Sequence, residues 1–400
     1  MRGDKSTDAD GGTAGSGAAG SAGGPAPVTL REVAREAGVS YATASRALNG
    51  SDRTVREENA ARVREAAARL GYLPYLPAQA VARGFSSTAA LVVADMDDPY
   101  FASIAVGVVD AAEEAGLIVT MAVADRTPEL EVQLVHKLRG HRPQVIIVAG
   151  SRIEGPQDAL VAELEAYRSA GGRVALISQE GLPFPTVPID NYGGARALAR
   201  TLVDLGRDGF GIVHSGDRIH TSRDRRQGFT DGLREAGLEP VLIEEAFSRD
   251  GGRRAGRSLH PEVRTVFAVN DVMAIGVSSG LREAGRVPGA EVAVAGFDDV
   301  EEARYATPAL TTVRVPLREI GRLALRIALD PGGDTAGAGV RGSAGGGGRD
   351  SVRDGAWVSP KGAARVPPEG AAGAVVRVPP EVVVRDSTPG RSACGGSASG

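Results

Sequence analysis

The chain has 400 residues, of which 42% are hydrophobic and 24% charged, and it carries a formal net charge of −4. This composition is ordinary for a soluble protein with a sizeable core, and the length allows two or three domains. It contains no run of about eighteen apolar residues and no basic patch followed by an apolar stretch at its start, so neither a membrane span nor a secretory signal is indicated. We therefore expect a cytoplasmic protein with no membrane partner.

Both ends of the chain have a biased composition. Residues 1–27 are almost entirely Gly, Ala, Ser, Thr and Asp, and residues 390–400 form a Gly/Ser-rich tail that holds the single cysteine, Cys394. One cysteine excludes an internal disulfide and a zinc site built from cysteines. Neither end can bury enough apolar surface to offset the entropy of ordering, so both are predicted to be disordered.

The stretch VTLREVAREAGVSYATASRALNG, residues 28–50, contains two helical patterns around Gly38. Thr29 followed by Glu32 has the spacing of a capping box at the start of the first helix. Gly38 permits a tight turn, and Ser40 is a suitable N-cap for a second helix that ends at about residue 48.

A third helix is predicted after a second capping box, Thr54 with Glu57, and it ends at Gly71. Short helices joined in this way, with a tight turn between the first two, form a helix-turn-helix unit, so residues 28–73 predict a small all-α head. Residues 28–85 hold nine arginines, no lysine and six acidic residues, a local positive charge that suits a polyanion.

The second helix of the head divides into two faces. Ala44, Ala47 and Leu48 can face the core, whereas the outward positions are small or hydrogen-bonding. Arg46 can grip the two acceptors of a guanine in the major groove, and Ala42 suits a thymine methyl group. The pattern favours DNA recognition over the alternative, a helical module that binds a protein or nothing.

Between residues 89 and 316, short runs rich in valine and isoleucine alternate with amphipathic segments. The runs are ALVVADM, LIVTMAVA, QVIIVAG, RVALIS, FGIVHSG, TVFAVND and EVAVAGFDD. Strands that are apolar on both faces belong to a parallel sheet covered by helices. There are too many for one sheet, so the pattern predicts two doubly wound α/β lobes that join near PTVPIDNYGGARAL, residues 185–198.

This two-lobed domain is predicted to span residues 88–329 and 373–389. Residues 74–87 would link it to the head. Residues 330–372 are rich in Gly and Pro and are predicted to be a disordered insertion, because loops at a surface tolerate lengthening at little cost.

Ligands of open parallel sheets bind beyond the carboxyl ends of the strands, and two lobes place two such edges face to face. The residues that follow the predicted strands are Asp95 to Phe101, Asp125, Ser178, Gln179, residues 215–225, Phe247, Asn270, Asp271 and Asp298. The set combines polar side chains, which can pair with hydroxyl groups, and aromatic rings, which can stack on an apolar face. This combination suits a sugar or a nucleoside. For each aromatic residue, simple core packing is the alternative.

Two groups of motifs occur in a fixed order along the chain. They are TLREVAREAGVSYATASRALNG and RVREAAARLGYLP in the head, followed by VVADMDDPYF, DNYGGARAL, FAVNDVMAIGV, VAGFDD, PALTTVRVP and PPEVVVRDST. In these motifs the chain resembles the LacI/GalR family of bacterial transcription regulators. The resemblance covers about residues 28–329 and 374–389. It implies a two-lobed, periplasmic-binding-protein-like effector domain, a homodimer, and repression of transcription from a pseudo-palindromic double-stranded DNA operator under control of a small effector.

Carried over by position, the resemblance assigns base contacts to Tyr41, Ala42 and Arg46, and backbone contacts to Thr29, Ser40, Thr43, Ser45 and Asn49. Some relatives have a long polar residue where this chain has Ala42. YLPYLPAQAVARG, residues 72–84, resembles the linker that becomes a helix on the operator and inserts an apolar wedge into the minor groove. The wedge position is Val81, where leucine is usual, and a passive linker is the alternative.

In the effector domain the resemblance assigns Tyr100 and Phe101 to an aromatic pair at the cleft and Arg225 to a grip on the effector. Phe247 matches a stacking aromatic, and Asn270 and Asp298 match positions that bind hydroxyl groups. An Asp or Arg is common in relatives at Ser178 and Gln179 and is absent here, so the effector, expected to be a sugar or a related metabolite, need not be a standard one. Gln179 remains a candidate contact.

No pattern in the chain supports catalysis, a cofactor or a metal. The histidines lack ligand spacing, and neither a GxSxG elbow nor a GxxxxGK[ST] phosphate loop is present. An enzyme of doubly wound fold is therefore a remote alternative. A sugar-binding protein of the periplasmic type shares the two-lobed fold, but the head and the missing signal peptide argue against it.

Overall fold

The computed structural model describes residues 28–49, 55–73, 84–150, 153–330 and 379–390. The chain forms two compact units, residues 1–79 and residues 80–400, which are considered separately below. The predicted arm, the wedge residue Val81 and all but the first residue of both the predicted tail and the predicted insertion lie outside the described residues.

The head consists of α1 (Leu30–Glu36), α2 (Tyr41–Asn49) and α3 (Glu57–Leu70). The capping box of α1 is confirmed, because the Thr29 side chain accepts a hydrogen bond from the Glu32 amide and the Thr29 amide donates to the Glu32 carboxylate at 2.7 Å. Gly38 makes the turn with φ +62°, in the left-handed region that glycine tolerates best. Ser40 caps α2 by accepting from the Thr43 amide at 3.1 Å.

The start of α3 differs from the prediction. Arg56 is its N-cap, makes no capping hydrogen bond to the described residues, and places Glu57 at the first position of the helix rather than the third. The predicted capping box of Thr54 and Glu57 is therefore wrong at Glu57, and Thr54 itself lies outside the described residues. The helix ends as predicted at Gly71, with φ +65°.

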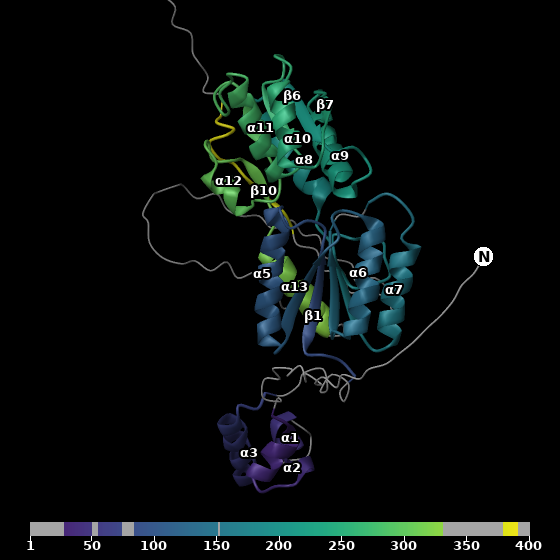
Figure 1. Ribbon diagram of the computed structural model, residues 1–400. Helices are drawn as coiled ribbons and strands as arrows, with labels where there is room; N and C mark the ends of the chain where they lie inside the picture. Colours follow the sequence, from purple (N-terminus) through teal and green to yellow (C-terminus); the bar gives the residue numbers. More distant parts are fainter. Residues whose placement is uncertain (1–27, 50–54, 74–83, 151–152, 331–378, 391–400) are drawn as a thin grey trace, which may run out of the picture. The chain divides into compact units, whose positions relative to one another are not determined.

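The first lobe is built on a parallel sheet in the order β2-β1-β3-β4-β5 (Figure 1). Its strands are β1 (Thr88–Val93), β2 (Ile118–Val123), β3 (Val145–Ala149), β4 (Arg173–Ile177) and β5 (Thr186–Val187). Helices α6 (Pro128–His141) and α7 (Asp158–Ser169) cover one face, and α5 (Pro99–Glu114) and α13 (Leu317–Leu329) cover the other. The sheet is thus doubly wound, as predicted.

The second lobe has a parallel sheet in the order β7-β6-β8-β9. Its strands are β6 (Phe210–His214), β7 (Val241–Glu244), β8 (Thr265–Ala268) and β9 (Ala293–Ala295). Its helices are α8 (Asn191–Asp204), α9 (His220–Arg234), α10 (Arg249–Arg257), α11 (Asp271–Glu283) and the short α12 (Glu301–Tyr305). An antiparallel pair, β10 (Thr312–Arg314) with β11 (Glu381–Val383), completes this part of the chain.

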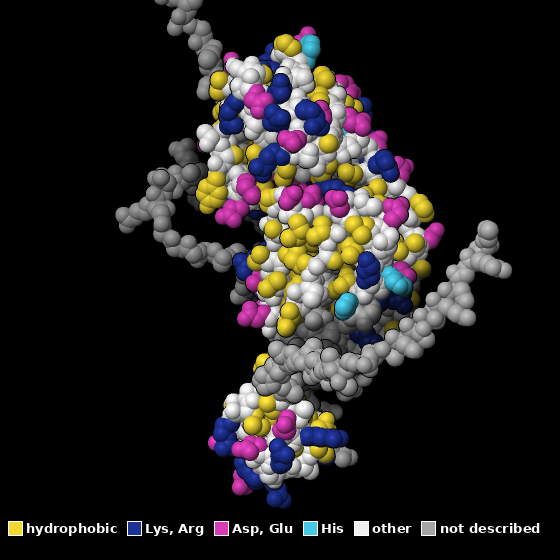
Figure 2. Space-filling model, in the orientation of Figure 1, with side chains coloured by type: hydrophobic (Ala, Val, Ile, Leu, Met, Phe, Trp, Pro, Cys, Tyr) yellow, Lys and Arg dark blue, Asp and Glu magenta, His cyan; other side chains and the backbone are white. Residues whose placement is uncertain are grey.

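Each of the runs expected to be strands contains a strand of the structure, and the predicted crossing leads from β5 into α8. Two features were not foreseen. Helix α13 follows the second lobe in sequence but packs on α5 and on β3 and β4, so the chain returns to the first lobe. Strand β2 lies at the sheet edge with Ile118, Met121 and Val123 exposed, and Figure 2 shows hydrophobic side chains gathered on this lobe.

Candidate functional site

The exposed surface of the head includes one face of α2. Tyr41 is 56% exposed, Ala42, Arg46 and the capping residue Ser40 are exposed, and Thr43 and Ser45 are half-buried. Ala44 is fully buried in the core of the head, as its position in the pattern predicts. Of the side chains assigned to DNA in this stretch, those of Ser40, Tyr41, Ala42 and Arg46 therefore point away from the core.

In the larger unit, residues with left-handed backbone conformations gather at the carboxyl ends of the strands. Asp125 and Arg126 follow β2 with φ +47° and +51°, and Ser178 follows β4 with φ +60°. Asp298 and Asp299, just after β9, have φ +117° and +55°. Such conformations cost free energy in residues other than glycine and cluster at functional sites, so they mark this region of both lobes as a candidate site.

On the second lobe, Arg225 of α9 is buried at the centre of the site. Its guanidinium donates to the Asp298 carboxylate at 2.7 Å, to the Asn191 side-chain oxygen at 2.8 Å and to the Val269 carbonyl at 2.8 Å. It also lies 3.8 Å from the centre of the Phe297 ring, a cation–π contact. A buried charge needs such partners, and these three hydrogen bonds use three of the five N–H donors of the guanidinium.

The partner carboxylate, Asp298, is itself buried. Burial raises the pKa of Asp298 to about 7, against the opposing effect of the Arg225 guanidinium. The loss of solvation disfavours the charged form of the Asp298 carboxyl group more than the ion pair with Arg225 favours it. Asp298 therefore stays protonated to a higher pH than an exposed aspartate does.

On the first lobe, Asp98 caps α5 by accepting from the Tyr100 amide at 3.0 Å. The Arg126 guanidinium lies 3.3 Å from the Asp95 carboxylate and 3.4 Å from that of Asp98. Burial raises the pKa of Asp98. Arg126 also reaches the second lobe, where its guanidinium lies 4.7 Å from the centre of the Phe247 ring.

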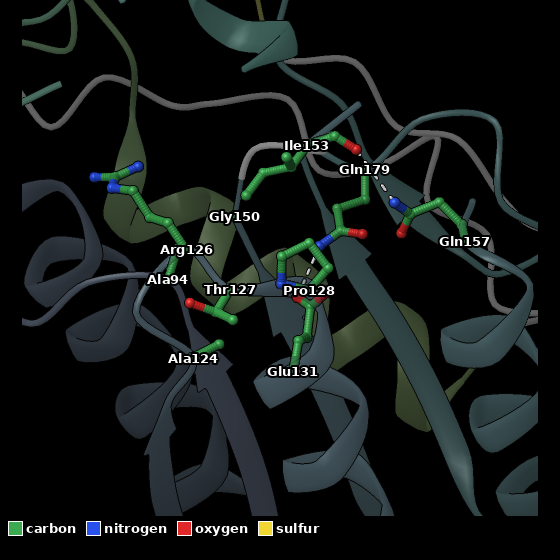
Figure 3. Close-up of a pocket in the computed structure, with 10 residues that line it drawn as sticks. All are labelled: Ala94, Ala124, Arg126, Thr127, Pro128, Glu131, Gly150, Ile153, Gln157 and Gln179. Atoms are coloured by element: carbon green, nitrogen blue, oxygen red, sulfur yellow. Dashed lines mark hydrogen bonds between the residues drawn. The ribbon is translucent and has the colours of Figure 1, made fainter. Parts of the chain in front are cut away.

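Gln179 points into a cavity of the first lobe (Figure 3). The side chain is 2% exposed and its Nε2 donates to the Glu131 carboxylate at 3.2 Å. Its Oε1 is buried and has no hydrogen-bond partner among the described residues. Burial raises the pKa of Glu131.

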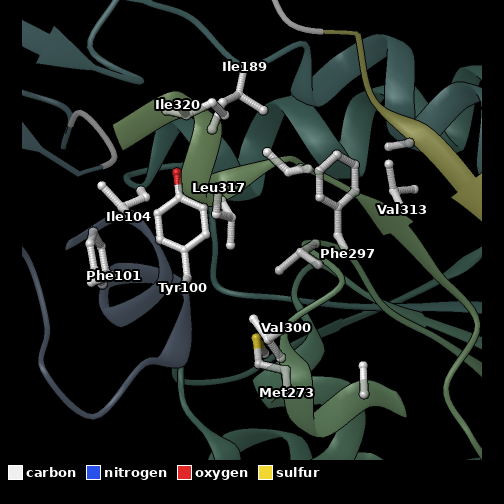
Figure 4. Packing of buried hydrophobic residues seen from close by; sticks show 14 of the residues in the cluster. Tyr100, Phe101, Ile104, Ile189, Met273, Phe297, Val300, Val313, Leu317 and Ile320 are labelled. Carbon is white, nitrogen blue, oxygen red and sulfur yellow. The ribbon is translucent and has the colours of Figure 1, made fainter. Parts of the chain in front are cut away.

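The aromatic pair at the start of α5 packs within the core. Tyr100 and Phe101 are 8% and 2% exposed, and their ring centres lie 4.9 Å apart in an edge-to-face arrangement. Figure 4 shows both among buried hydrophobic residues. The Tyr100 hydroxyl lies 3.4 Å from the Ser178 hydroxyl, and burial raises the pKa of Tyr100. Core packing thus accounts for much of what these rings contact.

Asn270 also has a structural partner. It is the N-cap of α11, and its side-chain oxygen accepts from the Met273 amide at 2.9 Å. The next residue, Asp271, is fully buried and accepts from the Thr312 hydroxyl and the Val300 amide. Asn270 and Asp271 therefore stabilise the edge of the site whether or not a ligand is bound.

The structure brings together Arg225 with Asp298, and Phe247 with Arg126. Sequence reasoning did not single out Arg126, Glu131, Asn191 or Phe297. Arg126 directly follows the candidate Asp125, so extending each strand end by one residue would have found it. Glu131 lies one helical turn into α6, where only the three-dimensional approach to Gln179 reveals it.

Other kinds of site find no support in the described part of the chain. The described residues contain no group of three or more His, Cys, Asp or Glu side chains placed to hold a metal ion. Among the helices of the described residues, none is long and apolar enough to cross a membrane. The chemistry of the site is hydrogen bonding by buried charged and polar groups.

Comparison with known families agrees with this architecture. The family described as bacterial regulatory proteins, lacI family, matches residues 29–75, and a periplasmic binding protein-like domain matches residues 199–338. These matches fall on the helix-turn-helix head and on the two-lobed unit.

Solved structures repeat the fold. The chain superposes on a transcriptional regulator CelR–cellobiose complex with a TM-score of 0.58 at 26% identity, covering 90% of this chain and 99% of that one. For the lac repressor dimer bound to operator and the anti-inducer ONPF, the TM-score is 0.71 at 22% identity, with 91% and 99% covered. The predicted fold class, an all-α head with a two-lobed α/β domain, is confirmed.

Sequence relatives match about three quarters of this chain. The regulator GalS of Salmonella typhimurium is 33% identical over 312 residues, which are 76% of this chain and 89% of that protein. The regulator CelR of Thermobifida fusca is 31% identical over 313 residues, 76% of this chain and 91% of that protein. The chain therefore belongs to the LacI family of bacterial regulatory proteins and is a DNA-binding transcriptional regulator.

Proposed function

We propose that this regulator is a repressor that binds a pseudo-palindromic operator as a homodimer and is switched by a sugar or a sugar derivative. The observation that carries the proposal is the buried Arg225–Asp298 pair at the carboxyl ends of the strands of the second lobe, opposite the Asp98–Arg126 pair of the first. Paired charged groups of this kind hydrogen-bond to hydroxyl groups. A solved transcriptional regulator, CelR, at 26% identity to this chain, is a complex with cellobiose.

The residues proposed to contact the effector lie at or next to these strand ends. They are Tyr100, Phe101, Gln179, Arg225, Phe247, Asn270 and Asp298. Arg126 joins them, because its guanidinium covers the ring of Phe247. An effector that stacks on the face of Phe247 that Arg126 covers displaces that guanidinium, so its entry there competes with the contact between the lobes.

The residues proposed to contact the operator are Thr29, Ser40, Tyr41, Ala42, Thr43, Ser45, Arg46 and Asn49, together with Val81 of the linker. Tyr41, Ala42 and Arg46 are exposed on α2, which suits base contacts in the major groove. The proposed domains are the head at residues 28–73, the linker at 74–87 and the effector domain at 88–329 and 373–389. The proposed function includes no catalysis. We expect the protein to act in the cytoplasm, where the operator lies.

An apolar surface of the first lobe supports the proposed dimer. Val106 and Val109 of α5 are 46% and 47% exposed, and Met121, on the side of the edge strand β2 that faces α5, is 40% exposed. Exposed apolar side chains gathered over neighbouring elements are typical of protein interfaces. A second copy that covers this surface gives the twofold symmetry that a palindromic operator requires.

The two lobes also touch through their loops. Ile153 forms a backbone bridge with Ile219, and the Glu154 amide donates to the Arg218 carbonyl at 2.7 Å. An effector changes the equilibrium between two lobe arrangements only as far as it binds one arrangement more tightly than the other. A shift in their populations from 1:99 to 99:1 needs a difference of about 5.5 kcal/mol in binding free energy.

The test is a thermal-shift screen of the full chain against sugars, sugar phosphates and nucleosides. A ligand at one hundred times its dissociation constant stabilises the folded state by about 2.7 kcal/mol. Operator duplexes selected from a random pool are then titrated with and without that ligand at several salt concentrations. We expect a steep salt dependence and a change in operator affinity on adding the ligand. Selection of no preferred duplex, or an operator affinity that no stabilising ligand changes, contradicts the proposal.

A further inference from the structure

We propose that the first lobe carries a DNA-contacting surface of its own, which binds the sugar-phosphate backbone of the duplex that the head recognises. We call this surface the basic edge and define it by Lys137, Arg139, Arg142 and Arg173. The inference goes beyond the proposed function and depends only on DNA binding, not on a sugar effector or on repression. Three observations carry it: an imbalance of charge, a strained arginine, and the place where the linker enters the lobe.

The first observation is the charge at the amino ends of the strands of the first sheet. Residues 136–142, the end of α6 and its C-cap, have the sequence HKLRGHR, which holds a lysine, two arginines and two histidines but no acidic residue. Arg173, the first residue of β4, is exposed at the same edge of the sheet. Within the described part of the chain, Lys137, Arg142 and Arg173 take part in no salt bridge.

The positive charge is confined to this part of the lobe. At the same edge of the sheet, the end of α5 carries Glu113 and Glu114 instead. The opposite edge, at the carboxyl ends of the strands, carries Asp95, Asp97 and Asp98. Figure 2 shows histidine and Lys or Arg side chains together near the lower end of this lobe. A local excess of cations on a chain with a net charge of −4 is typical of a surface that meets a polyanion.

The second observation is the backbone of Arg142. Six described residues other than glycine have a left-handed backbone; five of them lie at carboxyl strand ends, and Arg142, with φ +48°, lies at the other edge. Glycine is usual at such a helix end, because a side chain there costs free energy. The favourable interaction of cations with a helix C-terminus accounts for Arg139 and His141 in the last turn of α6, but not for a strained arginine after it. The exposed Arg142 side chain therefore indicates a functional contact.

The third observation is the place where the linker enters the lobe. The Ser86 amide and hydroxyl donate to the Arg142 carbonyl at 2.8 and 3.0 Å, which fixes Arg142 to the first residues of the lobe. Gly84 and Arg142 line the same groove, whose volume is about 580 Å³. Only residues 74–83 separate Gly84 from Leu73 of the head, and a fully extended chain of that length spans at most about 40 Å. DNA bound by the head is therefore tethered at a high effective concentration near the groove.

The form of the groove suits a nucleic-acid backbone. Its cations are spread over α6, the cap of α6 and the start of β4, which suits a row of phosphates and offers no side chain arranged to read a base. Gly84 and Gly140 line the groove without side chains that would obstruct a backbone. Arg139 already pairs with Glu163, so Lys137 and Arg142 are the cations of α6 and its cap that remain for phosphates.

The test measures DNA binding by the full chain. A duplex selected from a random pool and an unrelated duplex of equal length are titrated at several salt concentrations, with fluorescence anisotropy as the readout. We expect Lys137→Gln/Arg142→Gln to weaken binding to both duplexes by the same factor, about tenfold at low salt, and to make the slope of log K against log salt shallower by about two. Arg257→Gln/Arg282→Gln removes two exposed arginines from the second lobe and is the matched control, with an unchanged slope.

Two single variants separate binding from folding. Arg142→Gly removes the side chain and relieves the left-handed strain, so we expect its melting temperature to equal or exceed that of the wild type while the salt slope becomes shallower by about one. Arg142→Lys keeps the charge and is expected to keep the wild-type slope. An unchanged slope in the double variant, an equal loss in the control, or a loss confined to the selected duplex overturns the proposal.

A small phosphorylated ligand is the other occupant that the groove could hold. Thermal stabilisation by millimolar inorganic phosphate that Lys137→Gln/Arg142→Gln abolishes, with unchanged DNA binding, would assign the groove to such a ligand and overturn the proposal. The response of DNA affinity to sugars is measured in the same samples. If no sugar changes DNA affinity but the double variant flattens the salt slope, the proposed effector function fails and the basic edge stands; a sugar response with an unchanged slope gives the reverse.

Discussion

The guanidinium of Arg126, in the first lobe, lies 4.7 Å from the centre of the Phe247 ring, in the second lobe. Arg126 reaches this position from the end of β2 with a left-handed backbone, φ +51°, and it also pairs with Asp95 and Asp98. Contacts of this kind contribute about 0.5–2 kcal/mol, enough to bias an equilibrium between lobe arrangements several-fold. The strained residue thus holds together the loops between which an effector has to enter.

The first prediction concerns that contact. Arg126→Gln removes the cation, so we expect faster amide hydrogen exchange in residues 125–127 and 245–248, which lie on opposite lobes. Arg142 also has a left-handed backbone, φ +48°, but is not part of this contact. Arg142→Gln is therefore the control and leaves exchange in both loops unchanged. Exchange in Arg126→Gln that matches the wild type would show that the contact does not restrain the lobes.

The second prediction follows from the raised pKa of Asp298, about 7 in the folded protein against an ordinary value of 3.8. Between these values the folded state holds a proton that the unfolded chain has released, so the free energy of unfolding falls as pH rises through this range. Asp298→Asn removes this contribution. We expect urea titrations to show the wild type losing stability relative to the variant from pH 5 to pH 7, with little further relative change above pH 8.

The control for this experiment is Asp97→Asn, at an exposed acid in the same cleft-facing loop as Asp98. Its stability curve is expected to run parallel to that of the wild type. Parallel curves for Asp298→Asn as well would mean that Arg225 keeps Asp298 ionised throughout, and the assignment of the pH dependence would be wrong.

The fold was predictable from the sequence because its strands are buried on both faces. β1 and β3 are continuous runs of small and branched apolar residues, which periodicity alone identifies. The return of α13 to the first lobe was not predictable, since an amphipathic helix does not specify which sheet it covers. The edge position of β2 was not predictable for a similar reason. The apolar pattern of β2 predicts that Ile118 and Met121 are core residues, and only the strand order shows that they are exposed.

For the site, the rule that ligands bind at strand ends led to Asp98, Gln179 and Asp298, all of which lie there. The rule does not identify the side chains with which these residues pair. Arg225 comes from a helix and reaches Asp298 across 73 residues of sequence, and Gln179 reaches Glu131 across 48. Such pairs depend on tertiary packing, so no local pattern contains them.

The third prediction concerns the head. Arg46 is exposed on α2, and a bidentate contact to guanine is worth about 1–3 kcal/mol of discrimination. We expect Arg46→Ala to lose about tenfold or more in affinity for a selected operator and to become less selective at one base pair in each half-site. Arg69→Ala, on α3, removes an equal charge that pairs with Glu36 at 3.2 Å, and is expected to weaken binding to all duplexes by a similar, smaller factor. Equal losses of selectivity in both variants would contradict the assignment of α2 as the reading helix.

The fourth prediction concerns assembly. Met121 lies on the exposed edge strand of the first lobe, and a glutamate there places a charge in the apolar surface that Met121 forms with Val106 and Val109 of α5. Burying an unpaired charge in an interface is strongly unfavourable, so Met121→Glu is expected to sediment as a monomer at concentrations where the wild type is a dimer. Leu242→Glu, on the edge strand of the second lobe, is the matched control and is expected to leave the dimer intact. Because two heads on one dimer bind the two half-sites together, the monomeric variant should also lose far more affinity for a full operator than for a single half-site. A Met121→Glu protein that remains dimeric would place the interface on another surface.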